Sequence, residues 1–196
     1  SSMIFWAAAA SSIAFWSSTV SSHLISMTKN SNTKHTIFRV FNTYGPGENL
    51  NYNKKGMVSI YASYLWKNKP IVIKGSIERY RDFTFIDDSV NGLVLALLNP
   101  GSFGQIFNLT SGKKVLIKDL IELMKIAAGK DKNYPIDINN STPGDSFGFN
   151  GSNEKIKKLL NWTPNYNLEK GLNNYFNWIK KVPISDNLLN YHPFKL

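Results

Sequence analysis

The sequence has no cysteine among its 196 residues. This absence excludes disulfide bonds and thiolate-bound metals, and it fits the reducing environment of the cytoplasm, where we expect the protein to act. Histidine is scarce as well, since only His23, His35 and His192 are present and no two have the i, i+4 spacing of a helical zinc site. We therefore expect no bound metal.

Glycine-rich nucleotide-binding turns are also missing. No Gly-x-Gly-x-x-Gly or Gly-x-x-Gly-x-x-Gly turn follows an expected strand, and no Gly-x-x-x-x-Gly-Lys-Ser/Thr loop occurs. The chain thus lacks the usual cradle for the pyrophosphate of a dinucleotide. No Ser/His/Asp arrangement is recognisable either.

Residues 1–28 contain no Asp, Glu, Lys or Arg and consist mainly of Ser, Ala and large apolar residues. A signal peptide needs a basic segment before its apolar run, and a membrane span needs ~20 predominantly apolar residues, whereas serines interrupt this segment. We interpret it as the core of a larger α/β domain cut off at its start. An interfacial anchor and an incorrect sequence are the alternatives.

The formal net charge of +10 raises the question of nucleic-acid binding. The lysines are spread along the chain in ones and twos, mostly at positions where an expected helix would face solvent. This distribution favours solvated faces and attraction of an anionic small ligand over a nucleic-acid surface.

From residue 35 onwards, β-branched strands alternate with periodic helices, which is typical of an α/β fold. The expected strands cover 35–41, 71–73, 82–86 and 105–109. We expect Asp87 and Asp88 to cap one helix and Gly129 to end another. The expected helices cover 56–67, the stretch from 87 to 98, the stretch from 116 to 128, and a last pair around 156–160 and 168–179.

Several short motifs occur in a fixed order along this part of the chain. They are Arg-x-Phe-Asn-x-Tyr-Gly-Pro-Gly at 39–47, Lys-Gly at 74–75, Tyr-Arg-Asp-Phe-Thr-Phe-Ile-Asp-Asp at 80–88, Asn-Leu-Thr-Ser-Gly at 108–112, Pro-Gly-Asp at 143–145, Leu-Leu-Asn-Trp-Thr-Pro at 159–164 and Leu-Glu-Lys-Gly at 168–171. In order and spacing, they resemble the signatures of the extended short-chain dehydrogenase/reductase family. The resemblance covers about residues 35–181 and is closest to UDP-hexose 4-epimerases and related NAD-dependent nucleotide-sugar epimerases and dehydratases.

The resemblance implies the C-terminal part of a doubly wound, Rossmann-like parallel sheet with a small α+β substrate-binding lobe. Residues 1–34 would be an atypical remnant of the Rossmann domain. Residues 35–196 would hold its last strands, interwoven with the nucleotide-sugar-binding lobe. The implied cofactor is NAD, the implied ligand is a nucleotide sugar, and a homodimer is expected, without a membrane partner.

Three site residues follow from the first motif. The resemblance implies that Val40 and Phe41 contact the nicotinamide end of NAD through their backbone. It also implies that Asn42 hydrogen-bonds the sugar or its phosphate, because an amide offers both donors and an acceptor. An Asx-turn before the Gly-Pro pair is the alternative role for Asn42.

The arginines of the third motif are the strongest candidates for binding a diphosphate. The guanidinium of Arg81 can bind two phosphate oxygens, and Arg79 lies two residues earlier on the same face of a strand. An ion pair between Arg81 and Asp87 or Asp88 is the alternative. We expect Asp82 to fix the geometry of a loop.

The remaining substrate-binding candidates come from loops. Lys55, Gly56 and Met57 precede or begin a helix, whose N-terminal amides favour phosphate. The resemblance further implies that Lys74 lines the base pocket and that Asp145 belongs to a later substrate loop. Many relatives carry an Arg just before the last loop, where this chain has Thr142.

The catalytic pair of the family is not identifiable. Its members use a Tyr-x-x-x-Lys pair to take a proton while hydride passes to NAD, since a phenol with a pKa near 10 is a poor base at neutral pH. The corresponding positions hold Ile13 and Ser17, although 17–28 can still form a helix, with Val20, Leu24 and Met27 on one stripe. Either the protein is longer than this sequence, which we prefer, or the chain is catalytically dead.

The resemblance therefore predicts a parent enzyme that interconverts or dehydrates a nucleotide sugar by transient oxidation at C4. A non-catalytic binding module, either a nucleotide-sugar sensor or an RNA binder, is the alternative.

Overall fold

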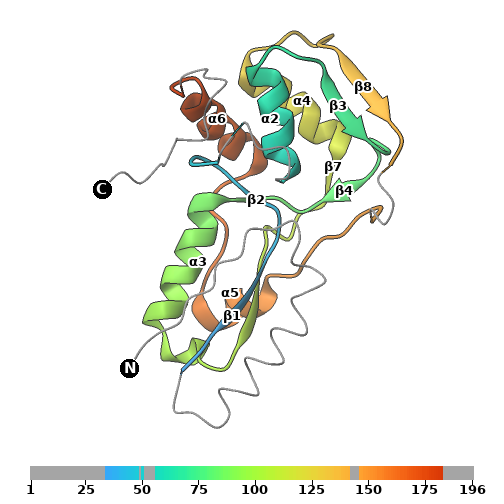
Figure 1. Cartoon of the computed structure of the whole chain (residues 1–196). Helices are drawn as coiled ribbons and strands as arrows, with labels where there is room; N and C mark the ends of the chain where they lie inside the picture. Colours follow the sequence, from blue (N-terminus) through green and yellow to red (C-terminus); the bar gives the residue numbers. More distant parts are fainter. Residues whose placement is uncertain (1–33, 49, 51–55, 142–145, 183–196) are drawn as a thin grey trace. The chain divides into compact units, whose positions relative to one another are not determined.

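The structure is a computed structural model that describes residues 34–48, 50, 56–141 and 146–182 (Figure 1). The chain forms two compact units, each assembled from three separate stretches of sequence. The first unit contains residues up to Thr43, Asp82–Lys113 and Asn150–Asn165. The second contains Tyr44–Arg81, Lys114–Phe149 and the residues from Tyr166 onwards.

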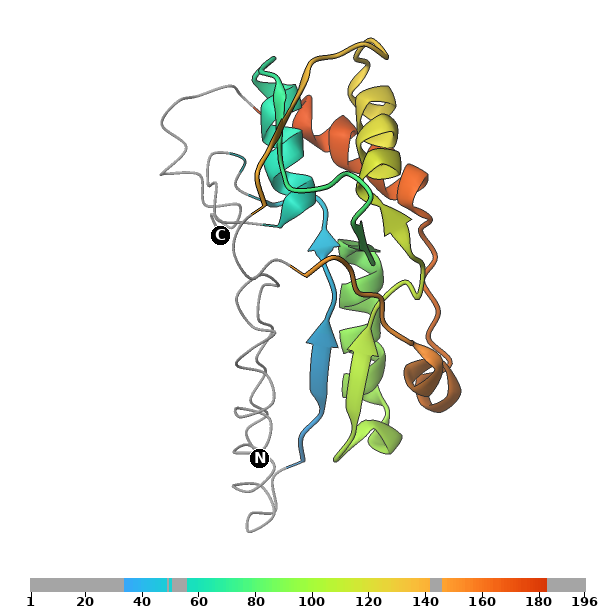
Figure 2. The same ribbon diagram turned by 90° about the vertical axis from the view of Figure 1, so that its right-hand side faces the viewer.

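The first unit is built on two parallel strands, β1 (Ile37–Val40) and β6 (Ile106–Leu109). They lie side by side in register from Ile37 against Ile106 to Val40 against Leu109 (Figure 2). The helix α3 (Ile86–Leu98) lies between them in sequence, which makes a β-α-β unit of the expected kind. The smaller elements of this unit are β5 (Thr84–Phe85), the 3₁₀ turn η1 (Pro100–Ser102) and α5 (Glu154–Leu160).

The core of the first unit lies between α3, β6 and the segment after α5. Trp162 is almost fully buried there, and its indole N–H donates to the carbonyl of Asp88 at 3.0 Å. A Cβ atom on Gly92 would lie only 2.4 Å from Leu109 Cδ2, so a larger residue there would displace the side chain of Leu109. The buried cluster comprises Ala96, Phe107, Leu109, Ile156, Leu160 and Trp162.

The second unit packs three helices with a parallel strand pair. Its helices are α2 (Met57–Trp66), α4 (Ile117–Ala128) and α6 (Leu168–Ile179). Its strands are β3 (Ile71–Lys74), paired in parallel with β8 (Ile136–Asn139), and β4 (Tyr80–Arg81), paired antiparallel with β7 (Val115–Leu116). The short strand β2 (Thr43–Tyr44) begins at the end of the first unit.

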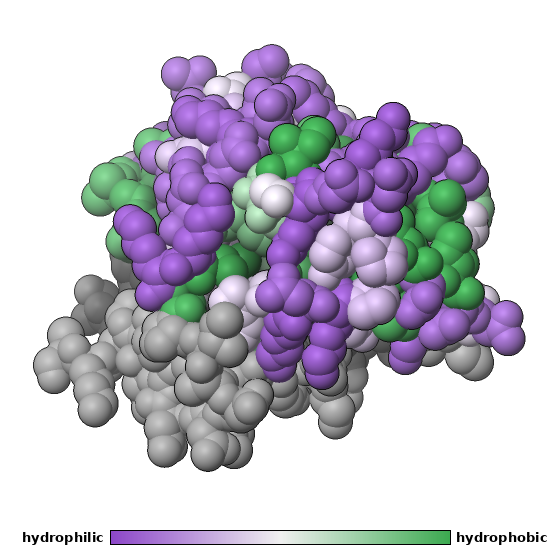
Figure 3. Space-filling model, turned by 90° about the horizontal axis from the view of Figure 1, so that it is seen from above, coloured by the Kyte–Doolittle hydropathy of each residue, from purple (hydrophilic) through white to green (hydrophobic). Residues whose placement is uncertain are grey.

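The buried faces of these helices follow the apolar spacing seen in the sequence. On α4 this face consists of Ile117, Leu120, Ile121 and Met124. As predicted, Gly129 ends α4 in the left-handed conformation, with φ of 68°. Seen from above, the surface is largely hydrophilic, with separate apolar patches (Figure 3).

Two local predictions are wrong. Residues 82–86 do not form one strand, because the chain makes only the short strand β5 before α3 begins at Ile86. Asp87 and Asp88 do not cap α3, since they lie within its first turn and Phe85 occupies the cap position. There they still place negative charge at the positive end of the helix dipole.

In the described ranges, no helix is long and apolar enough to cross a membrane, and no cluster of His, Asp and Glu has the composition of a metal site.

Candidate functional site

Asn42 is the second residue after the end of β1, at the carboxyl edge of the parallel strand pair, where open α/β sheets bind ligands. The side-chain NH₂ of Asn42 donates to the backbone carbonyl of Asp82 at 2.8 Å. The backbone carbonyl of Asn42 accepts a hydrogen bond from the N–H of Thr84 at 3.4 Å. These two bonds fix the end of β1 against the segment before α3. They leave the amide oxygen of Asn42 pointing to no donor among the described residues.

Asp82 is completely buried and organises two loops of the first unit. Its carboxylate accepts five hydrogen bonds, from Ser111 N at 2.9 Å, Ser111 Oγ at 2.7 Å, Gly112 N at 3.0 Å, Gly151 N at 3.3 Å and the hydroxyl of Thr110. Because all these donors point at one carboxylate, its charge is well compensated. Asp82 therefore fixes loop geometry, as expected from the sequence.

Val40 and Phe41, the predicted cofactor contacts, are half-buried at the end of β1. The N–H of Phe41 donates to the carbonyl of Leu109 at 3.0 Å, which continues the pairing with β6. Its carbonyl accepts a long hydrogen bond of 3.5 Å from the hydroxyl of Thr43. A backbone contact with a ligand would therefore have to use carbonyl oxygens here, because the N–H of Phe41 is already engaged.

In the second unit, a tight turn follows β3 and carries two of the predicted binding residues. Gly75 adopts φ of 85°, and a Cβ atom there would lie 3.2 Å from Cζ of Arg79. Arg79 folds back over the turn, where its Nε donates to Ser76 O at 3.0 Å and its Nη2 donates to the carbonyl of Lys74. The turn thus holds Lys74 and Arg79 together.

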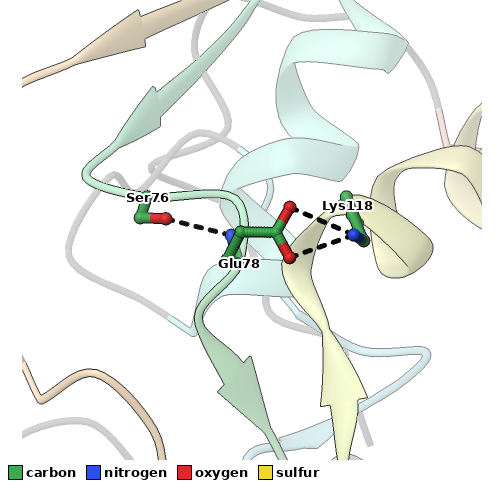
Figure 4. Close-up of polar contacts among 3 residues, drawn as sticks. All are labelled: Ser76, Glu78 and Lys118. Carbon is green, nitrogen blue, oxygen red and sulfur yellow. Dashed lines mark hydrogen bonds and ion pairs between the residues drawn. The ribbon is translucent and has the colours of Figure 1, made fainter.

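The same turn is fixed from outside by an ion pair. Glu78 Oε1 and Oε2 each accept from Lys118 Nζ at 3.0 Å, and the N–H of Glu78 donates to Ser76 Oγ at 3.1 Å (Figure 4). About half of each ion-pair side chain is exposed, so this contact contributes little stability.

Arg81 is buried, with 6% of its surface exposed, and its guanidinium binds main-chain carbonyls. Nη1 donates to Tyr80 O at 2.8 Å and to Phe147 O at 3.3 Å, and Nη2 donates to Ser146 O at 2.8 Å. The guanidinium also lies 5.0 Å from the ring centre of Phe149. Arg81 therefore positions the loop that follows the predicted Pro-Gly-Asp segment.

Tyr61, on the second turn of α2, lies within electrostatic reach of both arginines. Burial raises the pKa of Tyr61 to about 12, although the charges of Arg79 and Arg81 oppose this rise. Burial likewise lowers the pKa of Arg81, and the nearby charge of Arg79 lowers it further. The two guanidinium groups thus share a mostly desolvated region, in which an anion would be stabilised.

Gly56 and Met57 stand at the N-terminus of α2, as predicted. The carboxylate of Glu48 accepts from Tyr175 OH at 2.9 Å and from the hydroxyl of Ser59, the third residue of α2. A carboxylate of the chain itself thus already supplies the negative charge that a helix N-terminus favours. Lys55 and Asp145 lie outside the described residues.

The structure thus gathers Lys74, Arg79 and Arg81 in the second unit, while Val40, Phe41 and Asn42 belong to the first. The sequence interpretation missed Tyr61 and Phe149. Tyr61 lies on the apolar stripe of α2 and therefore gave the signal of a core residue. Phe149 lies shortly after the Pro-Gly-Asp motif, and this position in the sequence could have identified it as a loop residue near the site.

Comparisons with known proteins place this architecture in a family. Residues 18–175 match the family described as GDP-mannose 4,6-dehydratase, which is well over half of the chain. The chain belongs to the extended short-chain dehydrogenase/reductase family of nucleotide-sugar epimerases and dehydratases. This confirms the predicted α/β fold with its Rossmann-like parallel strands.

Two family members with curated functions illustrate the range of activities. A UDP-glucuronate 4-epimerase of Thermodesulfobacterium geofontis is 32% identical over 147 residues, covering 74% of this chain and 43% of that protein. UDP-glucuronic acid decarboxylase 1 of Arabidopsis thaliana is 31% identical over 136 residues, covering 69% of this chain and 30% of that protein. The chain therefore spans less than half the length of these relatives.

Solved structures of family members superpose well on this chain. The UDP-glucose 4-epimerase of Thermotoga maritima with UDP-glucose has a TM-score of 0.77 at 27% identity, covering 84% of this chain and 52% of that one. The UDP-glucuronic acid 4-epimerase of Bacillus cereus with UDP-glucuronic acid and NAD has a TM-score of 0.72 at 25% identity, covering 90% and 57%.

Proposed function

We propose that this protein takes part in the NAD-dependent conversion of a nucleotide-diphosphate sugar by transient oxidation at C4, most closely in the manner of a UDP-hexose 4-epimerase. The relatives act on nucleotide sugars as epimerases, decarboxylases and reductases. Both solved structures described above contain a UDP-sugar, and the one from Bacillus cereus also contains NAD.

The pair of buried arginines in the second unit carries this proposal. The guanidinium groups lie close enough for the charge of Arg79 to lower the pKa of Arg81, so Arg81 is in an environment that disfavours its positive charge. A diphosphate bound beside these groups would relieve this cost, because nearby negative charge favours the charged form of a guanidinium. Tyr61 adds a protonated hydroxyl that can donate to the same ligand.

The family resemblance also predicts contacts with a sugar and the cofactor for residues of the first unit. The amide of Asn42, held by Asp82, presents its oxygen at the carboxyl edge of the parallel strands, where it can accept from a sugar hydroxyl. For NAD, the fit is limited to the nicotinamide end. There the half-buried residues Val40 and Phe41, at the end of β1, offer backbone carbonyl oxygens. The sequence has no glycine-rich turn for the pyrophosphate.

At the backbone carbonyls of Val40 and Phe41, the nicotinamide end of NAD would supply a reversible hydride acceptor for C4 of the sugar. Residues 18–175, which match the family, would bind and orient the nucleotide sugar during the hydride transfer. A homodimer, expected from the family resemblance, and a cytoplasmic location, expected from the absence of cysteine, belong to the same proposal.

A thermal-shift titration with UDP-glucose tests this proposal. We expect the melting temperature to rise with ligand concentration, because a ligand that binds only the folded state stabilises it. Arg81→Lys keeps the charge but removes the planar fork, so it should abolish most of the shift. Lys118→Gln, which breaks only the exposed ion pair in Figure 4, is the matched control and should keep the full shift.

A non-catalytic role remains the competing function, because no Tyr-x-x-x-Lys pair precedes residue 35. If the protein binds RNA with a steep salt dependence that Arg81→Lys does not change, and UDP-glucose causes no shift, the proposal fails in favour of that role. If UDP-glucose binds but no turnover occurs with added NAD, the chain acts as a nucleotide-sugar sensor.

A further inference from the structure

Loop 146–149 lies on β4 although its own aromatic side chains are largely exposed. Phe147 and Phe149 are 61% and 40% exposed, so burial of their rings holds the loop only weakly. The carbonyl of Phe147 accepts from the N–H of Tyr80 at 3.3 Å and from Nη1 of Arg81 at 3.3 Å. Backbone contacts with β4 therefore fix much of the position of the loop.

Gly148 lies against the aromatic ring of Tyr80, with which it forms an isolated parallel bridge. A Cβ atom on Gly148 would lie 2.3 Å from Cε1, 2.4 Å from Cδ1 and 2.6 Å from Cζ of Tyr80. All three distances are well below the separation of carbon atoms in contact, which is about 3.5–4.0 Å. A larger residue at position 148 would therefore push the ring and the loop apart.

The ring of Tyr80 has further contacts that resist such a displacement. The ammonium group of Lys114 lies 4.2 Å from the ring centre. The ring of Phe147 meets it edge-on, with 6.3 Å between the ring centres and an interplanar angle of 78°. Because both contacts would be weakened if the ring swung away, part of the displacement caused by a side chain at position 148 would fall on the loop.

We propose that Tyr80 and Gly148 are positioning residues for the diphosphate site, because their contact sets where the carbonyls that hold Arg81 lie. This inference rests on the proposed function. Nη2 of Arg81 donates to Ser146 O at 2.8 Å and Nη1 donates to Phe147 O, so a shift of these carbonyls turns the guanidinium or breaks its hydrogen bonds. All of these residues belong to the second unit.

The orientation of this guanidinium matters for a phosphate but not for a nucleoside. Its planar fork binds phosphate oxygens with a defined geometry, whereas uridine carries no phosphate to be oriented. A side chain at position 148 should therefore lower the affinity for UDP and spare the affinity for uridine. General damage to the fold would lower both.

Calorimetric titration of the full chain with UDP and with uridine tests the inference. Gly148→Ala should lower the affinity for UDP by about tenfold and leave the affinity for uridine within about twofold of its original value. Asn150→Ala changes an exposed side chain two positions further along the chain. It is the control and should keep both affinities.

A second substitution should restore the lost affinity. Tyr80→Val removes Cδ1, Cε1 and Cζ, which are the atoms that a Cβ atom at position 148 would meet. The combined variant of Tyr80→Val and Gly148→Ala should therefore bind UDP about as tightly as Tyr80→Val alone, whereas two independent changes would multiply their losses. A loss of affinity that Tyr80→Val does not reverse would overturn the inference.

Amide hydrogen exchange measures the same coupling without a ligand. The N–H of Tyr80 is protected by its hydrogen bond to Phe147 O. Gly148→Ala should speed its exchange by about fivefold or more, because the loop is pushed away, and Asn150→Ala should leave the exchange unchanged. Exchange of the Tyr80 N–H at the original rate in Gly148→Ala would contradict the inference.

These measurements separate the inference from the proposed function. If the original protein binds no UDP, the proposed function fails and the inference fails with it. If the original protein binds UDP and Gly148→Ala binds it equally well, only the inference fails.

Discussion

In the first unit a buried carboxylate gathers backbone donors, whereas in the second unit buried guanidinium groups gather backbone acceptors. Asp82 accepts from the N–H groups of two loops, and Arg81 donates to carbonyls of another loop. Both side chains are almost inaccessible to solvent. The comparison shows that buried charges hold loops in place in both units. Among the residues that the structure describes, the paired guanidinium groups that an anionic ligand could stabilise lie in the second unit.

The largest expected effect tests the first half of this comparison. Asp82→Asn replaces one acceptor oxygen by a donor that faces other donors, so we expect a loss of about 3 kcal/mol in the free energy of unfolding. Urea unfolding followed by circular dichroism measures it. Asp119→Asn, at an exposed position in the first turn of α4, is the control, and an equal loss in both variants would contradict the role of Asp82.

The stability of the protein should fall at high pH because of a tyrosine in the second unit. The pKa of Tyr61 is about 12 in the folded protein and about 10 when unfolded, so the unfolded state loses its proton first as the pH rises. Stability should therefore fall between pH 10 and pH 12, by roughly 2 kcal/mol from this residue. Tyr61→Phe should reduce the slope of the stability curve in that window, although Tyr175, whose pKa burial also raises, still contributes to it. An unchanged slope would contradict the assignment.

A substitution close to Asp82 should raise the free energy of unfolding by a smaller amount. Thr84 is buried, and within the described part of the chain its hydroxyl has no hydrogen-bond partner. Thr84→Val keeps the shape and removes this unpaired group, so we expect a gain of about 1 kcal/mol, measured by the same urea unfolding. Thr110→Val, which removes a donor to Asp82, should destabilise instead. If Thr84→Val and Thr110→Val both raised, or both lowered, the free energy of unfolding, hydrogen bonding would not explain their effects.

The smallest effect concerns the exposed ion pair of the second unit. Glu78→Gln should change the free energy of unfolding by about 0.5 kcal/mol or less, because both partners are half-exposed and screened by salt. Thermal unfolding at low and high salt checks this. A loss comparable to that of Asp82→Asn would mean that exposed and buried charges contribute alike, which would remove the contrast drawn here.

Much of the fold was predictable from local patterns. The stripes of α4 and α6, and the glycine that ends α4, are visible in the sequence because they depend on residues close in the chain. The strand β8 was not predicted, since it is short and its residue Ile138 is 59% exposed, which gives no buried alternation. The start of α3 was misplaced because the Asp pair resembles a cap but lies inside the helix.

The candidate site was predictable in its residue types but not in its contacts. The motif around Arg81 identified an important arginine, yet two of its three carbonyl partners lie 65 and 66 positions further along the chain. Such pairings depend on tertiary packing, which no local pattern encodes. The same holds for Asp82, whose donors come from residues 110–112 and 151.

The most direct test of the central claim is a calorimetric titration with UDP, UMP and uridine. If the arginine pair binds the diphosphate, UDP should bind tightest and uridine weakest, and Arg81→Lys should reduce the affinity for UDP by about tenfold or more while leaving uridine nearly unchanged. Equal affinities for UDP and uridine, or an Arg81→Lys variant that binds UDP as well as the original protein, would contradict the account.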